Sequence, residues 1–168
     1  MAMSVTISAA TDDDVEQILK LQYLCFQPEA ERHGDYGIEP LVQTLDQLRA
    51  ELDAGYVVVA RLGAEVIGSV RATVEPDTTA RISMLCVHPR MHRHGLGSRL
   101  LTRIEEHVRT ERAATRYRLS TGHADEVGLR LYRRNGYTPV DTVASAGGRA
   151  TLVTLEKEAS ATAFTTSA

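Results

Sequence analysis

The spacing of apolar residues changes along the chain, and each change marks a new element. Residues 5–8 read as a short strand, and apolar residues recur at helical spacing over 15–26 and again over 45–52. Three β-branched runs follow, and the short link between the first two is typical of a hairpin. The expected strands are 5–8, 56–62, 66–74, 80–87, 116–121, 137–143 and 149–156, and the expected helices are 11–26, 44–55, 97–112 and 126–136.

This order of elements, β-α-α-β-β-β-α-β-α-β-β, predicts an α+β fold with α/β/α layers. An antiparallel hairpin section leads into a strand–helix–strand unit, so we expect a mixed, mostly antiparallel six- to seven-stranded sheet with helices on both faces. A chain of 168 residues suits one domain, which we place at 1–158, and 159–168 reads as a C-terminal tail. The segment 27–41 holds two prolines and two glycines, so we expect it to be irregular.

Composition narrows the class of protein before any motif is considered. A net charge of -3 disfavours a general nucleic-acid binder, and no apolar run approaches the roughly 20 residues that span a membrane. The N-terminus does not read as a secretory signal. Cys25 and Cys86 lie far apart without CxxC partners, which favours free thiols and a cytoplasmic protein. His88, His92 and His94 have no matching carboxylate or cysteine cluster in the sequence nearby, so we expect no metal site.

The stretch CVHPRMHRHGLGSRLL, residues 86–101, joins a predicted strand to a predicted helix. Gly95 and Gly97 lack Cβ atoms, so backbone N–H groups there can approach a ligand closely. The helix N-terminus adds partial positive charge and unsatisfied donors. These features favour a pyrophosphate site, although neither GxxxxGK[ST] nor GxGxxG is present, which excludes two common phosphate loops.

The loop resembles a segment of the Gcn5-related N-acetyltransferases (GNAT), which has the form V-x-P-x-x-(R/Q)-x-x-G-x-G/A. Val87, Pro89, Gly95 and Gly97 match it, and His92 replaces the usual Arg or Gln. The element order also resembles the family from about residue 4 to 156, in its small-molecule acetyltransferase-like branch. A second family motif, LY-x-x-x-G-F/Y, is matched by Leu131, Tyr132, Gly136 and Tyr137.

The resemblance implies transfer of an acetyl group from acetyl-coenzyme A to a primary amine of a small molecule or peptide. It implies direct attack in a ternary complex, with no metal, and a fourth strand splayed from the fifth so that the coenzyme arm pairs with its edge. Relatives often place an Asn before the tyrosine, where this chain has Asp125 and Gly128. The implied coenzyme-binding residues are Leu85, Cys86, Val87, His92, Arg93, His94, Gly95, Leu96, Gly97, Ser98 and Asp125.

Tyr132 stands where many relatives place the acid that protonates the leaving thiolate, so the resemblance implies that role. The base that deprotonates the amine stays open: Glu75 and His123 are two candidates, and deprotonation through water is a third. A backbone N–H between Leu85 and Val87 is the expected oxyanion donor.

The sequence leaves two alternatives to an enzymatic function. His92, the missing Asn and the absence of a carboxylate in the fourth predicted strand fit a catalytically inactive acyl-coenzyme A-binding or sensor module. A basic nucleic-acid patch at 88–94 is disfavoured by the acidic net charge. We also expect the closing hairpin at 137–155 to offer an edge for a homodimer. The acidic residues expected to attract a cationic amine acceptor are Glu29, Glu31, Asp35 and Glu39.

Overall fold

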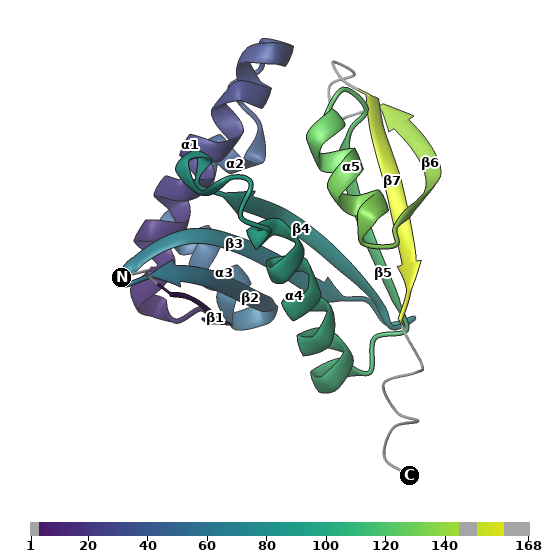
Figure 1. Cartoon of the computed structure of the whole chain (residues 1–168), viewed down its shortest axis with the longest axis horizontal. Coiled ribbons are helices and arrows are strands. Elements are labelled where there is room, and N and C mark those ends of the chain that lie inside the picture. The colour runs from purple at the N-terminus through teal and green to yellow at the C-terminus, as the bar shows by residue number, and fades with distance from the viewer. Residues whose placement is uncertain (1–3, 145–150, 160–168) are drawn as a thin grey trace.

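The computed structural model describes residues 4–144 and 151–159. The strands are β1 (Val5–Ala9), β2 (Tyr56–Leu62), β3 (Glu65–Val74), β4 (Thr79–Val87), β5 (Arg116–Gly122), β6 (Thr138–Ala144) and β7 (Thr151–Glu158). They form one seven-stranded sheet in the order β1-β2-β3-β4-β5-β7-β6 (Figure 1). Among the strands that the structure describes, only β4 and β5 pair in parallel, so the predicted mixed, mostly antiparallel sheet is confirmed.

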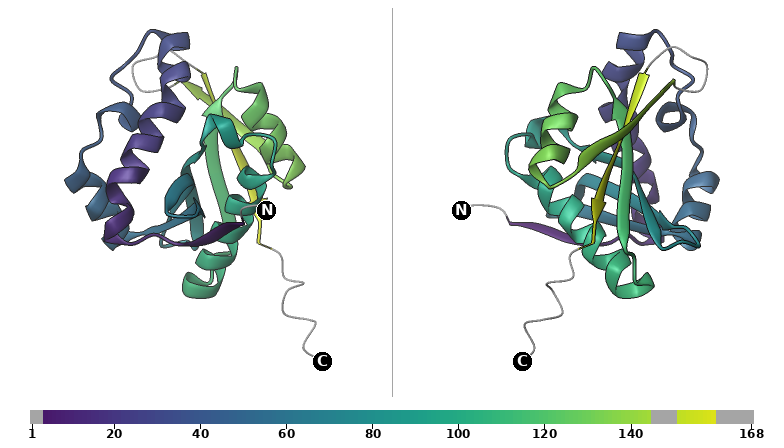
Figure 2. Two further views of the ribbon diagram at one scale, coloured as in Figure 1. Left: turned by 60° about the vertical axis from the view of Figure 1, so that its left-hand side comes forward. Right: turned by 90° about the vertical axis from the view of Figure 1, so that its right-hand side faces the viewer.

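Helices pack on both faces of this sheet, as predicted (Figure 2). They are α1 (Val15–His33), α2 (Glu39–Val42), α3 (Leu45–Ala54), α4 (Leu96–Arg112) and α5 (Glu126–Arg134), with single turns η1 (Asp12–Asp14) and η2 (Pro89–Met91). Alternate residues of β2 separate the two cores. Val57 and Val59 pack with α1 and α3, whereas Val58 and Ala60 pack with α4.

The N-terminal helix is longer than the sequence pattern indicates. The prediction that 27–41 is irregular is wrong for its first part, because α1 continues through Pro28 to His33. Pro28 costs α1 one hydrogen bond to the carbonyl of Leu24, but both residues lie on the exposed side of the helix, where water can satisfy that carbonyl. Buried Ala30 keeps the later turn packed. The short α2 was also missing from the predicted order.

A buried arginine fixes α1 and α3 against the sheet. Arg71 of β3 is 4% exposed and donates to Gln22 of α1, to Gln43 at 3.1 Å, and to Glu51 of α3. Gln22 also donates to the Gln43 side chain at 3.0 Å and to the Pro40 carbonyl at 3.1 Å. Because buried polar groups are costly without partners, this network holds α1 and residues 40–43 in one arrangement.

Strands β4 and β5 pair over their first three residues and then separate. Their ladder ends at the pair Arg81 and Arg118. Met84 has φ 55°, and the register between β3 and β4 shifts at the same level, which is the signature of a bulge that bends the strand. Residues 82–87 and 119–122 are therefore unpaired with each other, and Figure 1 shows the two strands separating toward α5. We call this region the β4–β5 divergence.

The closing hairpin lies at one edge of the sheet. Strand β6 is exposed along its length, with Val140 53% and Val143 42% exposed. The link between β6 and β7 falls outside the described residues, as does the predicted tail apart from Ala159, whose N–H donates to the Thr115 carbonyl at 2.9 Å.

Candidate active site

The loop between β4 and α4 ends in an uncapped helix N-terminus. Gly95, the N-cap of α4, has φ 72°, and Arg93 has φ 69°. A Cβ at Gly95 would meet no atom within 4 Å, so glycine is needed there for its backbone conformation rather than for space. The first helical bond runs from Arg99 to the Gly95 carbonyl at 3.2 Å, and no described side chain caps the helix. The N–H groups of residues 96–98 are thus left as donors.

Helix α5 holds this N-terminus in place. A Cβ at Gly97 would lie 3.0 Å from Leu131, so Gly97 allows α4 and α5 to pack closely. The Asn135 side chain donates to Ser98 at 3.0 Å and to the Leu131 carbonyl at 2.8 Å. Leu96 is buried beneath the loop. Asn135 was missed in the sequence because only its neighbour Gly136 belongs to the second motif.

The histidines of the loop do not gather around one point. His92 donates to the carbonyl of Val87 at 2.9 Å, and His88 accepts the N–H of Arg90 at 3.2 Å, so both stabilise the turn. His94 is exposed. Among residues 4–144 and 151–159, no group of three or more His, Cys, Asp or Glu is placed to hold a metal ion.

The end of β4 presents its backbone to the divergence. His88 donates its N–H to the Ile67 carbonyl at 2.8 Å, so the backbone groups of Val87, one residue earlier, face away from β3. The Val87 carbonyl accepts from His92 and from the Cys25 thiol at 3.4 Å. Its N–H points the same way, and Leu85, two residues earlier in β4, is half-buried. This strand edge can therefore accept a further extended segment.

Cys25 and Cys86 meet beside this edge. Cys86 is 6% exposed, and its sulfur lies 3.5 Å from the Ser69 hydroxyl. A hydrogen bond to Cys86, together with burial, raises the pKa of the Cys25 thiol. Cys25 therefore stays protonated near neutral pH, and Cys86 is covered by the core of α1 and the sheet.

Tyr132 of α5 lies where α1, β4 and the start of α5 converge. Its ring packs on the core that includes Val58, Ala60 and the buried side of α4. It also meets the Tyr137 ring edge-on, and the two ring centroids are 6.2 Å apart. Its hydroxyl makes no hydrogen bond with any residue that the structure describes. Burial raises the pKa of Tyr132, and the nearby Asp125, Glu29 and Cys86 raise it further. This hydroxyl is thus a protonated, unpaired donor.

Asp125 joins the start of α5 to β5 through its two carboxylate oxygens. One accepts the Gly128 N–H at 2.9 Å and the other accepts the Thr121 hydroxyl at 2.7 Å. A Cβ at Gly128 would lie 2.1 Å from the Asp125 carboxylate, so the cap requires glycine there. Asp125 therefore orients the helix that carries Tyr132, and its contact with a coenzyme stays a prediction.

Glu29 reaches the divergence from the opposite side. Its carboxylate lies 3.9 Å from the Cβ position of Gly122, at the end of β5. Burial raises the pKa of Glu29, and Asp125 raises it further, against the opposing effects of His33 and Arg32. From the sequence, Glu29 is predicted only as one of four acidic residues that attract the amine, because 27–41 is expected to be irregular.

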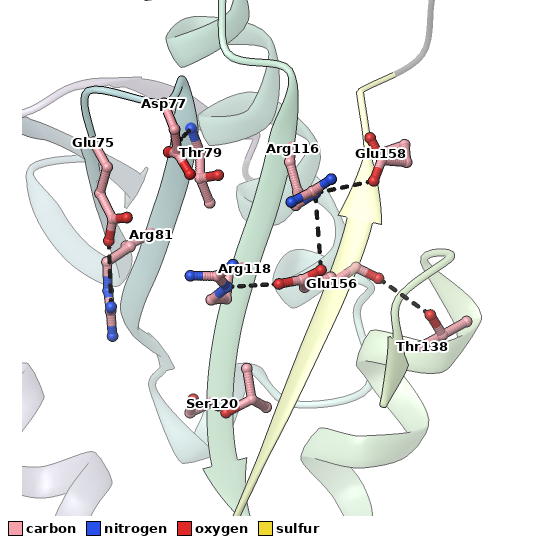
Figure 3. Close-up of polar contacts among 11 residues, drawn as sticks. Glu75, Asp77, Thr79, Arg81, Arg116, Arg118, Ser120, Thr138, Glu156 and Glu158 are labelled. Atoms are coloured by element: carbon pink, nitrogen blue, oxygen red, sulfur yellow. Dashed lines mark hydrogen bonds and ion pairs between the residues drawn. The ribbon is translucent and has the colours of Figure 1, made fainter. Parts of the chain in front are cut away.

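The two residues predicted as possible bases lie apart from each other. Glu75 pairs with Arg81 at 3.3 Å, near the start of β4 and away from the divergence at its other end (Figure 3). The paired first residues of β4 and β5 lie between Glu75 and the β4–β5 divergence. His123 follows β5 directly and donates its N–H to Thr151 at 2.9 Å, but its side chain is exposed. The structure does not bring Glu75 to Tyr132.

The other acidic residues of 27–41 face elsewhere. Glu31 is exposed, and the Asp35 carboxylate accepts the Gly37 N–H at 3.0 Å. Glu39 lines an open depression of about 510 Å³ between α2 and α3, together with Glu51 of α3. Of the four acidic residues, Glu29 is thus the one beside Tyr132.

Comparison with known proteins identifies the family to which this chain belongs. The model of the Acetyltransferase (GNAT) family matches residues 14–137, and the chain belongs to that family. No curated protein sequence is significantly similar to it. The PaiA N-acetyltransferase of Thermoplasma acidophilum, solved with coenzyme A, is 18% identical with a TM-score of 0.78, covering 93% of this chain and 99% of its own.

Two further solved structures share the fold. YncA of Salmonella typhimurium, a putative acetyltransferase solved with acetyl-coenzyme A, is 20% identical with a TM-score of 0.76, covering 94% of this chain and 95% of its own. The ribosomal-protein-alanine N-acetyltransferase of Brucella melitensis is 22% identical with a TM-score of 0.73, covering 91% and 99%. In the described part of this chain, no helix has the length and apolar character that crossing a membrane requires.

Proposed function

We propose that the protein transfers an acetyl group from acetyl-coenzyme A to a primary amine of a small molecule or peptide, by direct attack in a ternary complex. One observation carries this proposal: the β4–β5 divergence lies between an uncapped helix N-terminus and the unpaired Tyr132 hydroxyl. Membership of the family and neighbours solved with coenzyme A or acetyl-coenzyme A support it.

The loop suits the charged end of the coenzyme. Backbone N–H groups at 96–98 are donors without helical partners, and Gly95 and Arg93 turn the chain sharply into α4. Backbone donors at a helix N-terminus are a good fit for a pyrophosphate. The exposed side chains of Arg93 and His94 add further donors beside these backbone groups. Leu85 and Val87 offer the strand edge to the amide-containing arm.

The residues around the divergence suit the chemistry. Acetyl-coenzyme A would supply an acyl group activated as a thioester. The Val87 N–H, which faces the divergence, is our candidate for stabilising the oxyanion. Tyr132 holds its proton at neutral pH and donates it to the leaving thiolate. Burial disfavours the thiolate as it disfavours the phenolate, so the pKa of a thiol beside Tyr132 is raised as well, which offsets part of the weaker acidity of Tyr132.

A sensor without transfer activity is the second candidate. It is favoured by Asp125, whose carboxylate oxygens accept from Gly128 of α5 and Thr121 of β5 where relatives often present an Asn. It is also favoured by His92, whose ring nitrogen is hydrogen-bonded to the Val87 carbonyl where relatives carry Arg or Gln. Both candidates require coenzyme binding, and they differ in whether acyl transfer follows.

The test has two stages. Isothermal titration with acetyl-coenzyme A is expected to show binding, and thiol release is then measured across amines, polyamines, amino acids and peptides. Acetyl-, propionyl- and succinyl-coenzyme A are compared as donors. Release with at least one acceptor supports transfer, and binding without release on any acceptor favours the sensor. Absence of binding would contradict both candidates.

We further propose that the protein is cytoplasmic and forms a homodimer through β6. The location is supported by Cys25 and Cys86, which are in contact and remain free thiols. The dimer is supported by the exposed edge strand with Val140 and Val143 on its surface. Light scattering is expected to give twice the monomer mass, and a Val143→Lys variant is expected to be monomeric. A monomeric wild type would refute the dimer.

A further inference from the structure

We propose that Glu29 is the residue that receives the acceptor amine, binding its ammonium group and then taking the proton that the amine must lose. This assignment rests on the proposed acetyl transfer and names the class of acceptor: a primary aliphatic amine that arrives as a cation. The carboxylate belongs to α1 and faces the end of β5 across the divergence.

The position of Glu29 follows from the helical frame of α1. Residues 18, 22, 25 and 29 recur at the spacing of one helix face, and the first two are buried against the sheet or the Arg71 network. Cys25, one turn before Glu29, touches the Val87 carbonyl. The next turn therefore carries Glu29 along the same face to Gly122, which has no side chain to fill the space.

The Glu29 carboxylate lacks a partner in the part of the chain that the structure describes. No hydrogen bond or ion pair holds it, although it is half-buried. Burial and Asp125 raise its pKa, while His33 and Arg32 lower it, and Tyr132 is the other titratable group that faces it. A half-buried carboxylate without a partner is stabilised when a cation arrives. A base with a raised pKa also accepts a proton from an amine more readily.

The alternatives on the same side are already engaged or misplaced. One oxygen of Asp125 caps α5 and the other accepts from Thr121 of β5. Glu75 is paired with Arg81 at the other end of β4, and the His123 side chain is exposed. Glu29 and Asp125 both lie beside the proposed acid, Tyr132, and of the two Glu29 is the carboxylate without a hydrogen-bond partner among the described residues, as expected for a base that acts with that acid in one reaction.

The protons balance as follows. The ammonium gives one proton to Glu29 and becomes a neutral amine, whose lone pair forms the new C–N bond with the acetyl carbon. The C–S bond breaks, and the thiolate takes the proton of Tyr132. The second proton lost by the nitrogen restores Tyr132, and Glu29 releases its proton to water. The products are the amide, the free thiol and one proton.

The experiment compares Glu29→Gln with wild type, using an alkylamine acceptor taken from the panel. Acetyl-coenzyme A affinity is expected to be unchanged, and kcat/KM for the alkylamine at neutral pH is expected to fall by about 10²-fold. The deficit shrinks as the pH approaches the pKa of the free amine, since the amine then arrives neutral. Hydroxylamine, which is neutral at pH 7, is expected to react with the variant nearly as well as with wild type.

Two variants separate this role from a structural one. Glu31→Gln removes an exposed carboxylate two residues away and is expected to match wild type. Glu29→Asp keeps a carboxylate and is expected to recover part of the rate. An unchanged rate in Glu29→Gln, or an equal loss with hydroxylamine at every pH, would overturn the assignment while leaving acetyl transfer standing. A wild type that acetylates no amine would overturn the proposed function itself.

Discussion

Replacement of Tyr132 by phenylalanine is expected to lower kcat for acetyl transfer by at least about 10²-fold, with little change in acetyl-coenzyme A affinity. The hydroxyl has no hydrogen-bond partner among the described residues, so its loss breaks no contact of the fold. The ring keeps its packing on the core and its edge-on contact with Tyr137. Steady-state kinetics, titration calorimetry and thermal unfolding of the same variant check the three parts of this expectation.

Tyr137→Phe is the matched control, because its hydroxyl is structural. Tyr137 is 1% exposed and donates to Glu105 of α4 at 2.7 Å, and Lys157 contacts the same carboxylate at 2.9 Å. Losing a hydrogen bond to a charged group is expected to lower the free energy of unfolding by about 1.5–3 kcal/mol in urea, with kcat near wild type. An undiminished kcat in Tyr132→Phe would remove Tyr132 from the mechanism.

The raised pKa of Tyr132 also fixes the pH behaviour of this step. A general acid is active while protonated, so its contribution is present below its pKa and is lost as the pH rises through it. Burial, Asp125, Glu29 and Cys86 all raise that pKa above the ordinary value of 10. We therefore expect no loss of kcat from Tyr132 below about pH 10.

The sheet could be predicted from the sequence because period-2 and period-3.6 patterns report burial directly. The hairpin of β2 and β3 is an example: Val57 and Val59 face one core, and Val58 and Ala60 face the other. The pattern failed in α1, where Pro28 and the polar residues after it suggested a loop. Tertiary packing of Ala30 and the exposed position of Pro28 outweigh that local signal.

The site could be predicted only where one contiguous segment forms it. The loop at 92–98 is such a segment, and the resemblance located it. The contact of His92 with Val87, the Asn135 bond to Ser98 and the approach of Glu29 to Gly122 join segments far apart in sequence or depend on a backbone turn. No local pattern contains them, which is why the sequence leaves the amine base open.

Gly95→Val is expected to weaken acetyl-coenzyme A binding by about 10-fold or more. A side chain at φ 72° costs roughly 1–2 kcal/mol, and more when it is β-branched, so the loop relieves the strain by moving the N–H groups at 96–98. Because a Cβ at Gly95 would meet open space, the effect is one of backbone conformation and not of a clash. Gly95→Asn is expected to bind nearly as wild type, since Asn tolerates this region.

Gly63→Val separates loop geometry from general strain. Gly63 lies in the turn between β2 and β3, has φ 63°, and also faces open space. The two valine variants should therefore lose similar stability in urea unfolding, whereas only Gly95→Val should raise the Kd measured by calorimetry. If Gly95→Val binds acetyl-coenzyme A as tightly as Gly63→Val does, the donors at the α4 N-terminus do not hold the pyrophosphate. The exposed side chains of Arg93 and His94 would then be the groups to test for that contact.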